Sequence, residues 1–430
     1  MKMKALENIV LIDGCRTPFL KAGSQFKHLT SYDLARLALK GLTGKVHLDP
    51  NLVDRVILGT VISNLTTSNV AREALLGSGL SLKTPAFTVT QACISANVAM
   101  TSGLELIGSG QAQAVIAGGT ESMSDIPIRY RKKFRLKLIE SQKYRKLGDW
   151  LTFFKGLRFS DVLPEIPSIT EFSTGRTMGE DCDRLAARIG VARVDQDIFA
   201  ARSHQMAAQA TETGILGQEI EPVRLPSKFE TIDRDNGIRG DSTCESLARL
   251  KPAFVKPYGT ITAGNASFLT DGAAAVLLMN EGTAREKGYT PKAWIRHYTY
   301  SACNPEDELL LGPAYAISQI LEQSGLSLAD MDVFEFHEAF AGQVLANLKC
   351  LESADFGKEQ LNRNTAVGSI PMEKLNIHGG SLSLGHPFGA TGARLALTAA
   401  NRLHRENGKY ALVAACAAGA MGHAMIMERY

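Results

Sequence analysis

Short apolar segments with the length of strands alternate with helical patterns along the chain, and this alternation limits the fold more than any other feature. Residues 8–13 (NIVLID), 54–62 and 112–119 are apolar runs of strand length, whereas residues 31–42 (SYDLARLALKGL) repeat apolar side chains at helical spacing. Strands that alternate with helices favour a mainly parallel α/β architecture. At 430 residues, the chain is long enough for two or three domains.

The order of these patterns repeats in the last third of the chain. The stretch VDRVILGTVIS (53–63) corresponds to MDVFEFHEAFA (331–341), and GQAQAVIAGGTES (110–122) corresponds to GKYALVAACAAGA (408–420). We therefore predict two similar α/β halves separated by an insertion. The expected bounds are 1–127 for the N-terminal half, completed by about 251–282, then 128–250 for an inserted loop domain and 283–430 for the C-terminal half.

The inserted segment is strongly basic at its start. Residues 129–158 hold eleven Lys or Arg and two acidic residues, a local charge of +9 in a chain whose total is +3. Leu147, Trp150, Leu151 and Phe154 follow helical spacing, which predicts an apolar stripe beside a basic face. Two interpretations remain open: a solvated cap whose stripe packs on the core, or a surface that binds an anionic membrane or a partner subunit.

Several functional classes receive no support from the sequence. The total charge is too small to argue for nucleic acid, and no run of about 18 apolar residues predicts a membrane span. HEAFA (337–341) lacks the second histidine of a zinc-binding H-E-x-x-H motif, so no metal site is predicted. Seven cysteines without CxxC spacing favour reduced thiols, and a start without a signal-peptide pattern predicts a cytoplasmic protein.

Four side chains stand where α/β proteins place chemistry. Cys93 follows a strand-like run and precedes a small-residue helical pattern, and a helix N-terminus favours the thiolate of a cysteine. His386 precedes another small-residue helix, whereas His337 and Cys416 follow predicted strands. Each residue taken alone also fits a structural role, because buried cysteines and histidines are common. Together they suggest a nucleophile with acid and base partners.

These four stretches, in this order, resemble the thiolase family over essentially the whole chain. Further stretches resemble thiolase motifs at thiolase spacing: CRTPF (15–19), AGGTESMS (117–124), TMGEDCDRLA (177–186), RDNGIR (234–239), GTITAGNASFLTDGAAA (259–275) and GHAMIMER (422–429). The resemblance implies a thiolase-like fold, with two α/β halves packed as a five-layer αβαβα core. It also implies an acyltransferase that uses CoA as co-substrate, with no tightly bound cofactor.

The resemblance also implies residue roles. Cys93 would carry the acyl group, His386 would accept its proton, and Cys416 would protonate the leaving carbanion. His337 stands where most thiolases have asparagine, and it would bind the enolate oxygen together with His386. The backbone N–H groups of Cys93 and Ala418 would form the oxyanion hole. Residues at substrate-binding positions of the family are Met178, Arg239, Ser267 and Phe340.

Within the family, the sequence is most similar to the β-subunit type of fatty-acid-oxidation trifunctional complexes. ACISANVAM at the nucleophile, SFLTDG, HEAF and the long insertion carry this resemblance. It implies thiolytic cleavage of 3-oxoacyl-CoA, a homodimeric core, and a complex with a hydratase and dehydrogenase subunit. The alternatives are a biosynthetic acetoacetyl-CoA thiolase, a ketosynthase-type condensing enzyme, which lacks the second cysteine, and a non-catalytic docking or scaffold subunit.

Overall fold

The computed structural model describes residues 8–165, 170–225 and 230–430. The chain divides into two compact units, one made of residues 1–125 and 171–430 and the other of residues 126–170. Residues 171–250, which the sequence analysis assigned to the inserted domain, therefore group with the larger unit. The physical reason is that helices α7 (Met178–Ile189) and α8 (Arg193–Glu212) pack against α12 (Ala341–Glu352).

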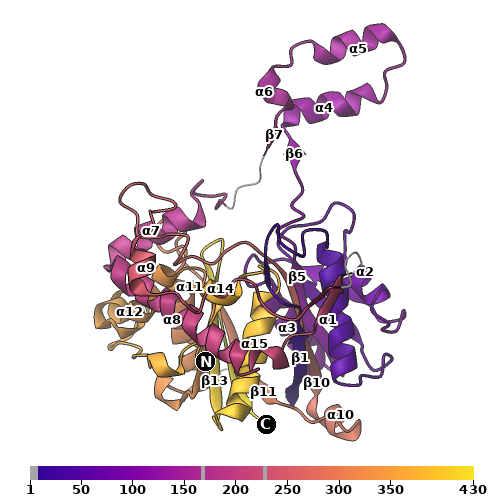
Figure 1. The fold of residues 1–430 in the computed structure, drawn as a ribbon. Helices are drawn as coiled ribbons and strands as arrows, with labels where there is room; N and C mark the ends of the chain where they lie inside the picture. The colour runs from indigo at the N-terminus through magenta and orange to yellow at the C-terminus, as the bar shows by residue number, and fades with distance from the viewer. Residues whose placement is uncertain (1–7, 166–169, 226–229) are drawn as a thin grey trace. The chain divides into compact units, whose positions relative to one another are not determined.

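Ten strands of the larger unit form one mixed sheet with two recognisable halves (Figure 1), and β8 and β9 pair separately. The N-terminal half has the order β4-β3-β5-β10-β1, and the C-terminal half has the order β11-β14-β13-β12. The two halves join where β1 pairs antiparallel with β11, through Val10 with Trp294 and Leu11 with Ala293. The strands are β1 (Ile9–Arg16), β2 (Leu20–Lys21), β3 (Arg55–Gly59), β4 (Ala86–Val89), β5 (Ala114–Glu121), β10 (Thr270–Asn280), β11 (Ala293–Ala302), β12 (Val333–Phe336), β13 (Tyr410–Ala417) and β14 (Met421–Arg429).

The pairing pattern confirms the internal repeat expected from the sequence. In the N-terminal half β3 runs parallel to β5, which pairs antiparallel with β10, and β10 pairs antiparallel with β1. In the C-terminal half β12 runs parallel to β13, which pairs antiparallel with β14, and β14 pairs antiparallel with β11. The two halves thus repeat one four-strand unit, and β4 extends the first of them at an edge.

Helices cover both halves of the sheet and also fill the space between them. Helices α1 and α2 pack on the N-terminal strands, and α11 and α12 lie on the C-terminal side. Helix α15 contacts strands of both halves, and it also contacts α3. One large apolar cluster lies between the N-terminal strands and α1 and α2, and a second lies between the C-terminal strands and α11 and α12. A third surrounds α3 and α15 and includes strands of both halves, which gives the expected αβαβα layering. These helices are α1 (Ser31–Lys45), α2 (Val70–Leu76), α3 (Ser95–Gly108), α11 (Gly312–Ser324) and α15 (Thr391–Arg405).

Local sequence signals explain where several helices begin and end. Thr30 caps α1 by accepting the N–H of Asp33, whose carboxylate accepts the N–H of Thr30 in return. Helix α7 ends at Gly190, whose φ of 70° suits glycine. The remaining elements of this unit are β8 (Val223–Leu225), β9 (Glu230–Ile232), α9 (Cys244–Ala248), α10 (Glu281–Glu286), α13 (Ala354–Gln360), α14 (Ser381–Leu384) and 3₁₀ turns at Leu216–Gln218, Leu328–Asp330 and Met372–Lys374.

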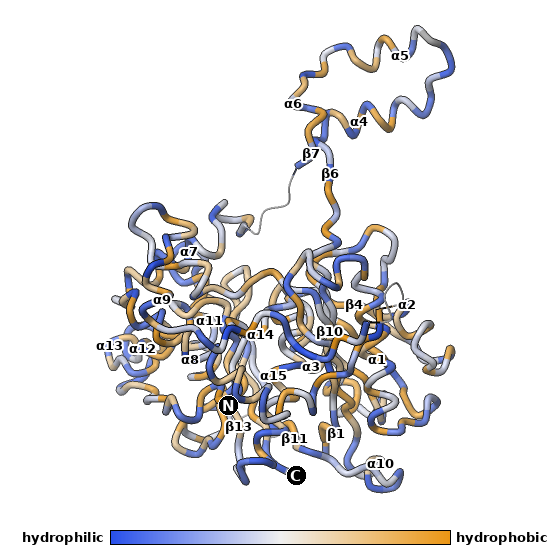
Figure 2. Tube along the Cα trace, in the orientation of Figure 1, coloured by the Kyte–Doolittle hydropathy of each residue, from blue (hydrophilic) through white to orange (hydrophobic). Residues whose placement is uncertain are grey.

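The smaller unit is a helical hairpin closed by a short two-stranded ladder. Its elements are β6 (Arg129–Tyr130), α4 (Lys132–Ser141), α5 (Leu147–Phe154), α6 (Phe159–Val162) and β7 (Pro164–Glu165). Phe153 is 5% exposed and packs edge-on against Phe134 with ring centroids 5.9 Å apart, so this small unit has an aromatic core of its own. Apolar and polar positions alternate along α4 and α5 in Figure 2. Among the described residues, no helix is both long and apolar enough to cross a membrane.

Candidate active site

Cys93 lies in a tight elbow between β4 and α3. Ala92, directly before it, has a φ of 46°, a conformation that non-glycine residues rarely adopt and that is often found at functional sites. The hydroxyl of Ser95 accepts the N–H of Gln91 and donates to the carbonyl of Ala92, which holds the elbow closed. Cys93 therefore sits immediately before the first turn of α3, as the sequence predicted.

Burial holds the thiol of Cys93 in its protonated form. Burial raises the pKa of Cys93 to about 12, although the backbone N–H groups of Ala418 and of Cys93 itself oppose this by hydrogen bonding to the sulfur. These are the two N–H groups expected to form the oxyanion hole. The thiol therefore needs a base at the moment of attack.

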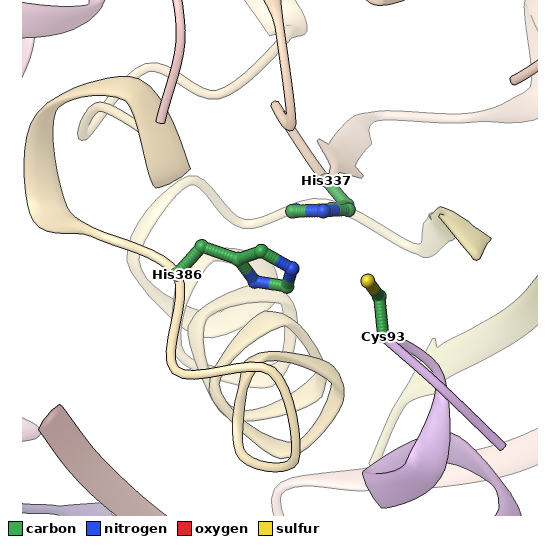
Figure 3. A group of neighbouring side chains, drawn as sticks. All are labelled: Cys93, His337 and His386. Atoms are coloured by element: carbon green, nitrogen blue, oxygen red, sulfur yellow. The ribbon is translucent and has the colours of Figure 1, made fainter. Parts of the chain in front are cut away.

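Two histidines converge on this thiol (Figure 3). One ring nitrogen of His337, one of His386 and the Sγ atom of Cys93 all lie within 4.8 Å of one another. The two imidazole rings are stacked at a tilt, with their centroids 4.0 Å apart. His337 comes from the loop after β12, and its backbone N–H donates to the carbonyl of Ala414 on β13. His386 precedes α15, and its backbone N–H donates to the hydroxyl of Thr270.

Both histidines are neutral over the whole physiological pH range. Burial, and next the charge of Arg394, lowers the pKa of His337 to about 3. Burial, the neighbouring His337 and Arg394 together hold the pKa of His386 well below its usual range. A neutral imidazole can accept a proton at one nitrogen and donate a hydrogen bond from the other, which is the chemistry that a thiol nucleophile requires.

Cys416 is the last but one residue of β13 and lies close to Cys93. It is 1% exposed, and its pKa is raised first by burial and then by the charge of Cys93. After it the chain turns sharply, with positive φ at Gly419 (80°) and Ala420 (56°). The turn brings the N–H of Ala418 to the sulfur of Cys93. The four predicted catalytic side chains thus converge, with Cys93 coming from the N-terminal half and the other three from the C-terminal half.

The type and spacing of Cys93, His337 and His386 also fit a metal ion, and among the described residues they are the one group found with such spacing. The sequence predicts a nucleophile here and no metal, and that stays a prediction.

Three of the four predicted substrate-binding residues lie near the catalytic group, and the fourth does not. Ser267 and Phe340 flank the site. The N–H of Ser267 donates to the carbonyl of Ala339, which precedes Phe340. Leu269, two residues after Ser267, forms a β-bridge with His386. Met178 packs against the apolar cluster that contains Phe340 and Cys416. Arg239 makes its described contact elsewhere, donating its N–H to Nδ1 of His204, so the structure does not bring it to the catalytic group.

One buried acid beside the site was not identified from the sequence. Glu121 ends β5 and accepts the backbone N–H groups of Val61, Ile62 and Gly389, each at 3.0 Å, and the hydroxyl of Thr60. Gly389 belongs to the turn that carries His386, so this carboxylate ties that turn to the end of β3. The sequence offers one signal for this residue, a charged side chain at the end of an apolar strand within the stretch AGGTESMS.

A cysteine with a histidine base, a second cysteine and a two-half α/β sheet define an acyltransferase that works through a thioester on the enzyme. The family model "Thiolase, N-terminal domain" matches residues 9–282, and "Thiolase, C-terminal domain" matches residues 289–429. The chain belongs to the thiolase family.

Similar proteins agree with this assignment. The chain is 53% identical to human mitochondrial trifunctional enzyme subunit beta, covering 99% of this chain and 89% of the relative. It is 52% identical to a probable 3-ketoacyl-CoA thiolase of Caenorhabditis elegans, covering 99% and 95%. The solved structure of human mitochondrial 3-ketoacyl-CoA thiolase in complex with CoA has a TM-score of 0.84 at 31% identity, covering 100% of both chains. A Bacillus anthracis acetyl-CoA acetyltransferase has the same TM-score at 32% identity, also covering 100% of both.

Proposed function

We propose that this chain is a 3-ketoacyl-CoA thiolase of fatty acid β-oxidation, which cleaves 3-oxoacyl-CoA with CoA to acetyl-CoA and a shortened acyl-CoA. The observation that carries the proposal is the convergence of Cys93, His337 and His386, with Cys416 beside them. Relatives named trifunctional enzyme subunit beta and 3-ketoacyl-CoA thiolase support the same reaction.

In the first half of the reaction, the sulfur of Cys93 attacks the 3-keto carbon while His386 takes the thiol proton. The resulting alkoxide is bound by the N–H groups of Cys93 and Ala418. When it collapses, the bond between C2 and C3 breaks and its electron pair forms the enolate of acetyl-CoA. His337 and His386 bind the enolate oxygen, and the thiol of Cys416 protonates C2, which leaves a thiolate at Cys416.

In the second half, the thiolate of Cys416 takes the proton of incoming CoA. The CoA sulfur attacks the acyl thioester, and the expelled thiolate of Cys93 recovers its proton from His386. Both cysteines end as thiols and both histidines end neutral, which matches the protonation states that burial favours for these four groups.

The experiment is a thiolysis assay of the purified chain with short, medium and long 3-oxoacyl-CoAs. We expect activity that extends beyond the four-carbon substrate. Activity confined to acetoacetyl-CoA would favour the biosynthetic alternative, to which the similar acetyltransferase structure points. No thiolysis of any substrate by a folded protein would favour a scaffold subunit. The presence of Cys416 next to Cys93 argues against the ketosynthase alternative.

For the smaller unit, residues 126–170, we propose docking on an anionic membrane surface. All eleven basic residues of the +9 segment lie in it. Several large apolar side chains beside them are exposed, namely Leu136, Ile139, Trp150, Leu151, Phe154 and Phe159. Leu147 also belongs to the apolar stripe expected from the sequence, but its side chain lies outside the described part of the chain. A lipid interface accepts apolar side chains and attracts basic ones at the same time.

Liposome co-sedimentation tests the docking. The variant changes Lys132, Lys133, Arg135 and Lys137 to glutamate, and the matched control changes the exposed Lys27, Lys40, Lys83 and Lys358 of the larger unit to glutamate. We expect the wild type and the control to bind anionic but not neutral vesicles, more weakly at high salt, and the variant to stay in solution. Binding only to a hydratase and dehydrogenase subunit would assign the unit to partner recognition. Binding to neither would leave the interpretation of a cap packed on the core.

We also propose that the chain forms a homodimer, because β4 ends the sheet as an edge strand with Phe87 38% exposed. Light scattering of the purified protein tests it, and a monomer at micromolar concentration would refute it.

The cytoplasmic location expected from the sequence stays a prediction. Relatives from six mammals are named as mitochondrial proteins. Cell fractionation decides between the two compartments.

A further inference from the structure

The two catalytic histidines are held by two different hydroxyl groups. Nδ1 of His386 lies 2.7 Å from Oγ1 of Thr391, and Nδ1 of His337 lies 3.0 Å from Oγ of Ser381. The Nε2 atoms of both rings are buried and have no hydrogen-bond partner among the described residues. The partner of Nδ1 therefore decides whether Nε2 offers substrate a lone pair or a proton.

For His386 the hydroxyl is an acceptor. Oγ1 of Thr391 donates its only hydrogen to the carbonyl of Pro387 at 3.0 Å, so Nδ1 of His386 must supply the hydrogen of the bond between them. The proton of this ring is then on Nδ1 and the lone pair is on Nε2. His386 is thereby prepared as the base for Cys93.

For His337 the arrangement is reversed. Oγ of Ser381 accepts a hydrogen from Nη2 of Arg394 at 3.2 Å, because a guanidinium can only donate. Among the described residues, the acceptor found within reach of the Ser381 hydroxyl hydrogen is Nδ1 of His337. If Nδ1 carried a proton instead, a fully buried O–H group would have no acceptor, which is costly. The lone pair of His337 is then on Nδ1 and the proton is on Nε2.

Arg394 is itself fixed in the protein interior. Its side chain is completely buried, and Nη1 lies 3.5 Å from the carboxylate of Glu335, which also binds Arg402 at 2.8 Å. The guanidinium therefore stays charged and keeps its position, since a buried charge must be paired. A continuous chain of contacts runs from Glu335 through Arg394 and Ser381 to His337.

We propose that Ser381, held by Arg394, is a positioning residue that fixes His337 with its proton on Nε2, so that the two histidines present opposite tautomers to the substrate. His386 supplies a lone pair and His337 supplies a hydrogen-bond donor to the developing enolate oxygen. The inference rests on the proposed roles of the two histidines and names what sets them. The low pKa of His337 supports it, because the ring stays neutral and its tautomer matters at every working pH.

A double-mutant cycle tests this role. Ser381→Ala removes the hydrogen bond to Nδ1, and we expect kcat for thiolysis to fall about 10- to 100-fold with little change in KM. In a His337→Ala background the same change should cost less than about twofold, because the serine then has no ring to orient. A merely structural serine would give losses that multiply in the two backgrounds, and that result would overturn the proposal.

Two further variants make the cycle specific. Ser383→Ala is the matched control, because Ser383 is equally buried two residues away but its hydroxyl contacts Ser203 and the carbonyl of Gly380. We expect it to keep wild-type kcat. Ser381→Thr retains the hydroxyl, and we expect it to recover activity relative to Ser381→Ala. An equal loss in Ser381→Ala and Ser383→Ala, or wild-type kcat in Ser381→Ala, would refute the positioning role.

A spectroscopic measurement reads the tautomer directly. In ¹⁵N-histidine-labelled protein, the signals lost in His337→Ala identify the ring, and Ser381→Ala should shift them away from the Nε2–H pattern. Unchanged signals would contradict the inference. Trapping of an acyl group on wild-type Cys93 is measured in parallel, because failure there would refute the proposed function and not the role of Ser381 alone.

Discussion

Replacing Glu121 by glutamine should change the pH dependence of stability more than stability itself. The carboxylate is completely buried, and the partners that the described residues offer it are three backbone N–H groups and the hydroxyl of Thr60, with no cation. Glutamine has nearly the same shape, retains one acceptor oxygen and cannot ionise. The substitution therefore separates the charge of Glu121 from its volume.

The magnitude follows from the shifted pKa. Burial raises the pKa of Glu121 from 4.5 to about 7. Between these pH values the folded protein holds the proton and the unfolded chain does not, so the free energy of unfolding falls as the pH rises. At 1.36 kcal/mol per pH unit the fall amounts to about 3 kcal/mol. Against this, glutamine leaves at least one backbone N–H facing an NH₂ group, at about 1–3 kcal/mol at any pH.

The assay is urea unfolding of the wild type and Glu121→Gln at pH 5 and pH 8. We expect the free energy of unfolding of the variant, relative to the wild type, to rise by about 3 kcal/mol between the two pH values. The control is Glu359→Gln, which removes a carboxylate from an exposed position. Activity of Glu121→Gln should fall, because Gly389 and the turn that carries His386 lose their anchor. A pH-independent difference between Glu121→Gln and the wild type would refute the reasoning.

Three other predictions test the site. Cys93→Ala should form no acyl-enzyme, whereas Cys416→Ser should still be acylated by acyl-CoA but turn over slowly, because serine is a far weaker acid; mass spectrometry decides, and an adduct on Cys416 alone would reverse the assignment. His337→Asn should retain appreciable activity through its amide donor, and His337→Ala should lose about 2–4 kcal/mol of transition-state stabilisation, measured by kcat/KM; alanine with wild-type rates would remove His337 from the site. Thr391→Val should slow acylation of Cys93 in stopped-flow measurements by freeing Nδ1 of His386, and an unchanged rate would show that this hydroxyl does not set the base.

Much of the fold could be predicted from the sequence because its signals are local. The apolar run before Asp13, the capping pair Thr30 and Asp33, and the alternation of strands with helices need no knowledge of distant residues. The layers and the boundary of the insertion were harder to predict. Residues 171–250 differ in composition from the flanking halves, yet their helices α7 and α8 pack against α12, more than 100 residues further along the chain.

The side chains proposed as catalytic could be singled out from the sequence, whereas the residues that support them could not. Cys93, His337, His386 and Cys416 stand at ends of elements and bear reactive groups, so position and chemistry both mark them. Ser381, Thr391 and Arg394 carry ordinary side chains in helical segments, and only three-dimensional contact shows which histidine each one serves. Hydrogen-bond partners of this kind leave no periodic trace in a sequence.

Helix α15 has a consequence for how the chain is made. It packs against strands of both halves, yet it spans residues 391–405 and is therefore synthesised after the whole N-terminal half. Strand β1 is synthesised long before β10 and β11, with which it pairs, and its hydrogen bonds are complete only when both are present. Apolar faces of the first half thus remain uncovered while most of the chain emerges from the ribosome, a period when exposed strands are prone to aggregate. This architecture makes assembly of the active site wait until both halves of the sheet have been synthesised.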